Sequence, residues 1–333
     1  MGKSDDRQGI FAIFNGCGEV SLTELSLSLL TQQKAAWSEL RLGYDALTFL
    51  KQRRIQVGDV TVALQCNPRR IKSTGAVLDP ASIRARPCFL CRENLPEAQK
   101  GILYREKFLV LCNPAPIFPV HFTLALIEHI PQSLIMHLSS LLDMAKDFSP
   151  DLALLYNGPR SGASAPDHLH FQAVIRASIP DIDNAVLDNR QVRKGTRDVV
   201  LFNTTNGERP VILVEGTDRH AMERCLIQVI GAMRRVLAVT DEPMLNLFCL
   251  YDGAKWRVVI YPRRRHRPDV FYKLGEEQIF ITPGAVEMGG LLVLPREEDY
   301  ERLDAHIIRE IFLDVALEQD RVEEIISAVE SDL

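Results

Sequence analysis

The sequence lacks any uncharged apolar run of the roughly 18 residues that a membrane-spanning helix needs. Its first ten residues, MGKSDDRQGI, are too polar for a secretory signal peptide. It also lacks an excess of basic residues: the net charge is −5 and the pI is near 6.0. This balance disfavours a general nucleic-acid or membrane surface, which would need clustered positive charge. We therefore expect a soluble, cytoplasmic protein with neither a nucleic-acid nor a membrane partner.

The chain also lacks the paired cysteines of a disulfide framework. Its seven cysteines are odd in number and lie mostly in apolar runs, where a cysteine acts as a small buried apolar residue. Cys88 and Cys91 differ from the others because only two residues separate them. Hydrophobic residues make up 46% of the 333, which is enough for a sizeable core and predicts two domains or one fused double unit.

Short strands and helices alternate without a regular βαβ repeat. Ser21 and Glu24 have the spacing of a capping box and predict a helix over 21–37. This pattern predicts an α+β fold with mainly antiparallel sheets. No low-complexity linker separates the predicted halves, 1–178 and 179–333, so we expect them to pack together. Further helices are predicted at 132–147, 218–238, 298–314 and 319–331, and strands at 54–57, 60–65, 108–112, 121–127, 152–156, 168–175, 198–203, 211–215, 246–251 and 256–261.

The sharpest local pattern is His168-Leu169-His170-Phe171-Gln172, which follows a loop rich in small residues at 157–167. Alternate residues of a strand share a face, so both histidines and Gln172 are expected on one side. They could be two structural histidines with satisfied hydrogen bonds. Small loop residues, however, let backbone N–H groups approach an anion. A phosphate beside a histidine is a setting for nucleophilic attack at phosphorus.

The second pattern is the pair Cys88 and Cys91. Prolines flank it on both sides, which is poor context for a redox motif that begins a helix. A zinc site needs four ligands, and His129 and His168 could supply the other two. Two unliganded buried thiols remain the alternative.

Two other basic features stay open between a structural and a functional role. His121 follows a proline-rich loop and could reach a ligand or be structural. The basic run Arg263–Arg267 is either a solvated loop or a phosphate site.

These residues together resemble the histidine-triad superfamily in its transferase branch. That branch includes galactose-1-phosphate uridylyltransferase, dinucleoside tetraphosphate phosphorylase and the GDP-hexose phosphorylases. Its motif ends in glutamine, as at Gln172, where the hydrolase branches have a third histidine. The resemblance is dense from about residue 60 to 176 and is weaker through Pro283-Gly284 and Gly289-Gly290. It is carried further by Asn67-Pro68-Arg69-Arg70, Cys88-Phe89-Leu90-Cys91, Asn113-Pro114 and Pro119-Val120-His121-Phe122.

The resemblance implies a HIT-like fold of two fused halves and a set of roles. His170 is then the nucleophile, and Gln172 hydrogen-bonds the nucleotidyl group. A structural zinc is held by Cys88, Cys91, His129 and His168. The residues expected to bind nucleotide or phosphate are Arg70, Asn113, His121, Asn157, Gly158, Ser161, Gly162 and Ser164.

The predicted function is nucleotidyl transfer through a covalent nucleotidyl-histidine. The substrate is a nucleotide sugar or a dinucleoside polyphosphate, and the acceptor is phosphate or a sugar phosphate, because Gln172 cannot donate a proton as an imidazolium does. The alternatives are a nucleotide hydrolase and a zinc-stabilised nucleotide-binding protein without turnover. A zinc nucleic-acid module is disfavoured by the acidic charge. The sequence leaves a homodimer open.

Overall fold

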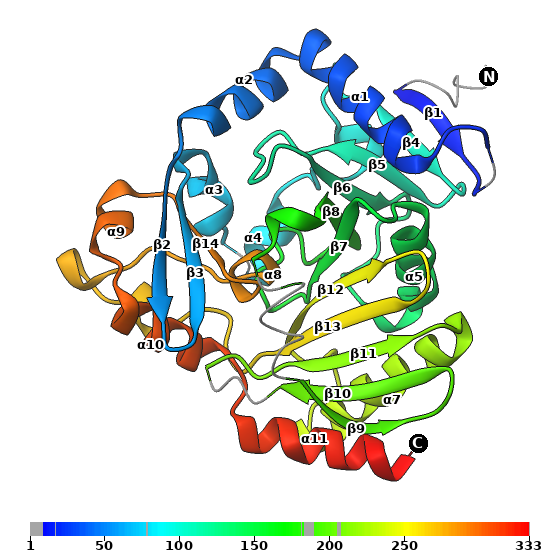
Figure 1. The fold of residues 1–333 in the computed structure, drawn as a ribbon. Helices are drawn as coiled ribbons and strands as arrows, with labels where there is room; N and C mark the ends of the chain where they lie inside the picture. Colours follow the sequence, from blue (N-terminus) through cyan, green and yellow to red (C-terminus); the bar gives the residue numbers. More distant parts are fainter. Residues whose placement is uncertain are drawn as a thin grey trace.

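The computed structural model describes residues 9–16, 18–77, 79–180, 182, 190–204 and 208–332. The N-terminal segment and Cys17 lie outside these ranges. Within them, eleven strands form one sheet and three strands form a second, smaller one. Pairing is antiparallel except between β1 and β4 and between β14 and β3. The predicted α+β class with mainly antiparallel sheets is confirmed (Figure 1).

The large sheet is continuous from one stretch of the chain to the other. Strand β7 pairs with β12, and around this junction the order β5-β6-β8-β7 is followed by its mirror, β12-β13-β11-β10. The strands are, across the sheet, β1 (Ile10–Phe14), β4 (Gly101–Tyr104), β5 (Phe108–Cys112), β6 (His121–Leu126), β8 (His170–Ile175), β7 (Leu152–Asn157), β12 (Leu245–Tyr251), β13 (Trp256–Pro262), β11 (Ile212–Gly216), β10 (Val199–Thr204) and β9 (Arg190–Gly195).

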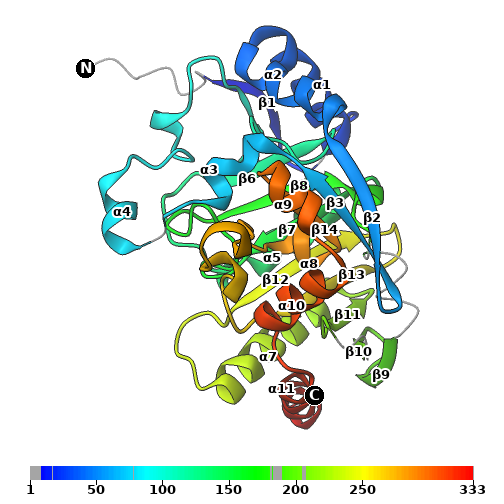
Figure 2. The same ribbon diagram turned by 90° about the vertical axis from the view of Figure 1, so that its left-hand side faces the viewer.

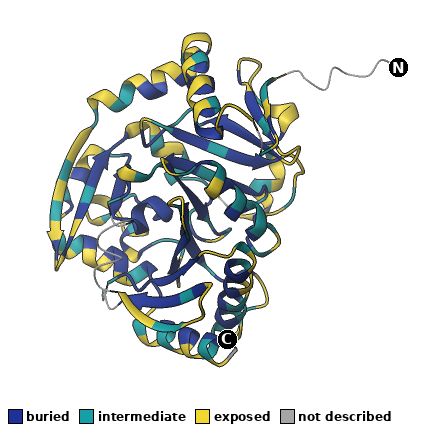
Figure 3. Ribbon diagram, turned by 45° about the vertical axis from the view of Figure 1, so that its right-hand side comes forward, coloured by how far each residue is buried: buried dark blue, intermediate teal, exposed yellow. Residues whose placement is uncertain are grey.

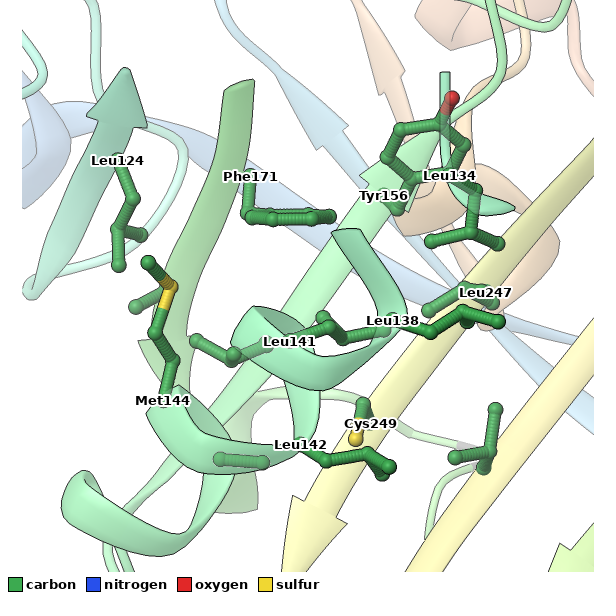
Figure 4. Packing of buried hydrophobic residues seen from close by; sticks show 14 of the residues in the cluster. Leu124, Leu134, Leu138, Leu141, Leu142, Met144, Tyr156, Phe171, Leu247 and Cys249 are labelled. Carbon is green, nitrogen blue, oxygen red and sulfur yellow. The ribbon is translucent and has the colours of Figure 1, made fainter. Parts of the chain in front are cut away.

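Helices cover one face of this sheet. In α5 (Leu138–Asp147), apolar residues three and four apart form a stripe that packs on β7, β12 and β13. Figure 4 shows Leu138 beside Leu247 and Leu142 beside Cys249. The capping box predicted for the first helix is confirmed. The other helices here are α1 (Leu22–Ala36), α2 (Ser38–Ala46), α7 (Arg219–Leu237) and α11 (Gln319–Asp332).

The small sheet and the late helices cover the opposite face. Strand β14 (Leu291–Leu294) runs parallel to β3 (Val60–Cys66), which forms a hairpin with β2 (Lys51–Val57). The chain after residue 284 therefore returns to the N-terminal part and packs over it (Figure 2). Figure 3 shows the strands between the two layers as mostly buried. The short helices are α3 (Ile71–Thr74), α4 (Pro80–Ala85), α8 (Ala285–Met288), α9 (Glu297–Arg302) and α10 (Ala305–Val315).

One predicted boundary is wrong in a way that matters for the site. Strand β8 begins at His170, not at His168, because the His168 N–H bonds to the Ala165 carbonyl and closes a turn. The two histidines therefore do not share a strand face.

No helix in the described ranges is long and apolar enough to cross a membrane.

Candidate active site

A cavity of about 880 Å³ lies at the C-terminal end of β7 and the start of β8. Its walls come from the α3 segment, the Cys88 loop, the loop after β7, and α8. Its charged lining has four basic and two acidic side chains, so the cavity favours an anionic ligand. These are Arg69, Arg70, Lys72, Arg86, Glu39 and Glu287.

His170 lines this cavity and is held from both sides of its backbone. Gln132 accepts from the His170 N–H at 2.8 Å and donates to the His170 carbonyl at 2.9 Å. The ring Nδ1 lies 2.9 Å from the His168 carbonyl oxygen, which can only accept, so Nδ1 carries the proton and Nε2 the lone pair. Burial lowers the pKa of His170 to about 4, against the opposing effect of that carbonyl. The ring is therefore neutral at pH 7.

Gln172 lies one pleat further along β8 and is oriented by His121. The Ile117 N–H donates to Nδ1 of His121 at 3.2 Å, so Nε2 is protonated and donates to Oε1 of Gln172 at 2.7 Å. Burial, aided by the nearby Arg70 charge, lowers the pKa of His121 to about 4 against the opposing effect of its hydrogen bond to Gln172. The amide nitrogen of Gln172 is then free to face the cavity that this residue lines. His121 itself lies behind Gln172 and does not line the cavity.

The loop after β7 forms the next wall. Gly162 has φ +91°, and a Cβ there would lie 2.8 Å from the Gly284 Cα, so two backbone segments meet where no side chain fits. Of the residues predicted to bind nucleotide here, Asn157, Gly162 and Ser164 line the cavity. Gly158 and Ser161 do not: Gly158 packs against the Leu245 carbonyl, and Ser161 is fully buried.

Arg70 and Asn113 lie on the side of the α3 segment. Arg70 donates to the Ala115 carbonyl at 2.9 Å, and Asn113 accepts from the Ala115 N–H at 3.0 Å. Burial lowers the pKa of Arg70, with the carboxylate of Glu287 opposing this. Arg70 thus presents a partly desolvated guanidinium to the cavity.

Sequence reasoning missed Gln132 and Glu287. Gln132 lies in a loop and acquires its role only when the chain folds back against β8. Glu287 accepts from the Gly284 N–H at 2.8 Å, and burial raises its pKa. The one available signal for Glu287 was the neighbouring Pro283-Gly284 and Gly289-Gly290 pattern.

The four predicted metal ligands come together beside this cavity. Their ligand atoms all lie within 4.8 Å of one another. Cys88 Sγ lies 3.2 Å from Nδ1 of His168, and Cys91 Sγ lies 3.1 Å from Nδ1 of His129. Tetrahedral zinc with bonds of about 2.0–2.3 Å needs ligand separations of roughly 3.5 Å. The Leu126 carbonyl, 2.7 Å from Nε2 of His168, accepts the proton on that nitrogen and leaves Nδ1 free to ligate. The donor set therefore fits a zinc ion.

None of the residues 263–267 lines the cavity. Arg264 and Arg265 are exposed and pair with Glu318 and Asp269, as expected of a solvated loop. Arg263 departs from that expectation because it is 1% exposed.

Two family models match the chain. Residues 29–175 match one described as a domain of unknown function (DUF4922), and residues 210–333 match one described as GDPGP1-like, C-terminal domain. No curated protein sequence matches.

The chain is also similar to solved structures of yeast Ap4A phosphorylase Apa2. The complex with AMP has a TM-score of 0.57 and 13% identity, covering 87% of this chain and 97% of that one. The complex with Ap4A has the same TM-score and identity, covering 88% and 97%. At this identity the likeness establishes a shared fold. Together with the C-terminal family match, it confirms the predicted resemblance.

Proposed function

We propose that this chain, a relative of the transferase branch of the histidine-triad superfamily, is a nucleotidyltransferase of the phosphorylase type. It takes a nucleotide sugar or dinucleoside polyphosphate and passes the nucleotidyl group to phosphate or a sugar phosphate. The observation that carries the proposal is the state of His170. Its Nδ1 lies 2.9 Å from the His168 carbonyl oxygen and donates to it, which leaves the Nε2 lone pair available in a cavity with excess positive charge.

The reaction then has two displacement steps. Nε2 of His170 attacks the α-phosphorus, a P–N bond forms, and the P–O bond to the leaving phosphate group breaks. The His168 carbonyl stabilises the positive charge that develops on the ring. In the second step an oxygen of the acceptor attacks phosphorus, and the P–N bond breaks to restore neutral His170. The donors available to nonbridging oxygens are the amides of Gln172 and Asn157 and the Arg70 guanidinium.

The metal site has a structural role in this proposal. Cys88, Cys91, His129 and His168 would hold zinc, which supplies rigidity and takes no part in the chemistry. Because His168 provides both a ligand nitrogen and the carbonyl that orients His170, the metal site and the nucleophile share one residue.

The division into halves 1–178 and 179–333 also stays part of the proposal. The mirrored strand order supports it. The pairing of β14 with β3 means that the C-terminal half would complete a layer of the N-terminal half.

The test is to trap the adduct. The protein is mixed with nucleotide sugars and dinucleoside polyphosphates labelled at the α-phosphate, without acceptor, and quenched in base, where a phosphoramidate is stable. The label should be found by peptide mass spectrometry on the peptide containing His170, and added phosphate should remove it. His170→Ala should give no adduct. The control His306→Ala, at an exposed histidine of α10, should label like wild type.

Two other outcomes would replace the proposal. A nucleoside monophosphate as sole product, with no effect of phosphate, would make the protein a hydrolase. Nucleotide binding without any adduct would make it a binding protein without turnover.

A further inference from the structure

Arg263, directly after β13, is a buried cation that is 1% exposed. The Glu287 carboxylate acts on its charge, but its guanidinium donates hydrogen bonds to uncharged oxygens. All five of its N–H donors are used. Nε donates to the Val315 carbonyl, Nη1 to the Pro283 carbonyl and to Oδ1 of Asn246, and Nη2 to the carbonyls of Arg265 and His266. Five satisfied donors explain how this charge is kept inside the protein.

The guanidinium fixes which way the Asn246 amide faces. A guanidinium can only donate, so the oxygen of Asn246 must face Arg263 and its nitrogen must face away. That nitrogen donates to Oδ1 of Asn157 at 2.8 Å and to the Ser161 carbonyl at 2.6 Å. A fully buried asparagine therefore links the cation to the loop after β7.

The same reasoning fixes Asn157. Its Oδ1 accepts from Asn246 and also from the Ala285 N–H at 2.7 Å, so the oxygen is turned away from the cavity. Its amide nitrogen, with two N–H donors, is the end left for the cavity that Asn157 lines. Arg263 thus orients the amide of Asn246, and Asn246 in turn orients the amide of Asn157. The order begins at Arg263 because a guanidinium can donate hydrogen bonds but cannot accept them.

We propose that Arg263 is a positioning residue of the active site, which sets the polarity of Asn246 and Asn157 so that Asn157 presents N–H donors to a phosphoryl oxygen of the bound nucleotide. The nature of this ligand rests on the proposed function, whereas the orientation of the amides does not. The proposal also gives a role to a residue of the basic run, directly after β13.

The sharpest variant is Asn246→Asp. A carboxylate at this position still accepts from Arg263 but has no proton for Asn157. Asn157 should then turn its amide nitrogen toward the carboxylate, because this charge-assisted bond outweighs the bond from the Ala285 N–H that is given up, and its oxygen should turn toward the cavity. We expect kcat/KM for the nucleotide substrate to fall by about tenfold or more, since a charge-assisted donor is lost in the transition state. KM for phosphate should not change.

A second pair of variants separates positioning from stability. Arg263→Lys keeps the charge but offers only three donors without the planar fork, and should lose activity to a similar extent. Arg257→Lys makes the same change at another buried arginine of β13, which pairs with Glu215 and does not line the cavity. It should retain activity within about twofold while losing comparable thermal stability. Equal loss of activity in both variants would contradict a positioning role.

A third test compares the effect of Asn246→Asp on activity in the wild type and in a second variant. In an Asn157→Asp background there is no amide nitrogen to orient, so adding Asn246→Asp should cost little further activity. If Asn246→Asp lowers kcat/KM by the same factor in both backgrounds, it acts by another route and the proposal is overturned.

The orientation can also be measured without any ligand or turnover. In protein labelled with ¹⁵N-asparagine, the Asn157 side-chain amide, assigned by its loss in Asn157→Asp, should exchange rapidly with water in the wild type. In Asn246→Asp it should be slowed by its new bond. Unchanged exchange would refute the proposal, even if the panel of substrates gives no turnover. No turnover with the predicted change in exchange would instead refute only the proposed function.

Discussion

At the scale of the residue, the site is defined by groups that can only donate or only accept. The His168 carbonyl decides which nitrogen of His170 is protonated, and the Ile117 N–H decides it for His121. His121 then orients Gln172. For both histidines a backbone group fixes which ring nitrogen carries the proton, so these proton positions follow from the fold.

Because His121 is kept neutral in the folded protein, the free energy of unfolding should depend on pH. Its pKa is about 4 in the folded protein and near 6.5 when exposed. Below pH 6.5 the unfolded chain binds a proton at His121 that the folded chain does not bind. The stability that the protein has with His121 neutral is therefore fully present above pH 6.5 and is lost as the pH falls toward 4. We expect the free energy of unfolding, measured by urea titration, to fall by about 3 kcal/mol across this window from His121 alone.

A comparison of variants isolates this contribution. His170 and His266 also have lowered pKa values and add to the loss in wild type. His121→Gln should be less stable at pH 7 but should lose less stability between pH 6.5 and 4. His306→Gln should follow wild type, because His306 is exposed. Parallel curves for wild type and His121→Gln would show that His121 is not held neutral.

At the scale of the element, the Cys88 loop is short and has little regular structure. It is followed by a 3₁₀ turn, Arg92–Asn94, and it lies between Pro87 and Pro96. Its conformation is held by hydrogen bonds such as that from Asn94 to the Cys88 carbonyl. Two ligands from this loop and two from distant histidines would join three segments of chain through one ion.

We therefore expect zinc binding and stability to be lost together. Elemental analysis of purified protein should give about one zinc per chain, and Cys88→Ser should lower both the zinc content and the midpoint of thermal unfolding. Cys225→Ser, at a buried cysteine of α7 away from the cluster, is the matched control and should keep its zinc. Wild-type protein without stoichiometric metal would exclude the site.

Elements that depend on local signals could be read from the sequence. The strand at Phe108–Cys112 and the capping box of α1 are confirmed by the structure. The start of β8 was misplaced because strand alternation assumes that pairing has already begun, whereas His168 is held in a turn. The periodicity of side chains therefore predicts a face only within the paired region.

The remainder of the site depends on tertiary contacts. Gln132 and Asn246 are ordinary polar residues in the sequence, and their roles arise only where distant segments meet. The pairing of β14 with β3 joins residues more than 200 positions apart and has no local signal. The four metal ligands could be predicted because cysteine and histidine carry recognisable chemistry wherever they lie.

At the scale of the whole molecule, residues before and after the proposed boundary at 178 share a core. The β7–β12 pairing makes the large sheet continuous, and one apolar cluster includes both Trp37 and Trp256. The Trp256 indole donates to the Leu142 carbonyl of α5 at 2.9 Å, and Glu242 accepts from Tyr156 and from the Leu134 N–H. These bonds connect the second stretch of chain to the first.

We expect the chain to unfold as one cooperative unit, although proteins of this length often unfold in stages. Its two tryptophans lie in different halves, so Trp37→Phe and Trp256→Phe each leave a reporter of one half. In each variant, tryptophan fluorescence and far-ultraviolet circular dichroism should give the same midpoint in urea. Separate midpoints would mean that the halves are independent domains.

Glu242→Gln tests the same coupling at a single junction. Burial raises the pKa of Glu242, and the carboxylate accepts two hydrogen bonds from the first half. A glutamine offers one oxygen in place of two, so one buried donor is left unpaired at a cost of about 1–3 kcal/mol. In a cooperative molecule this cost lowers the free energy of unfolding equally whether Trp37 or Trp256 reports it. A change confined to one reporter would show that Glu242 stabilises one half alone, and that the continuous sheet does not transmit stability across the β7–β12 junction.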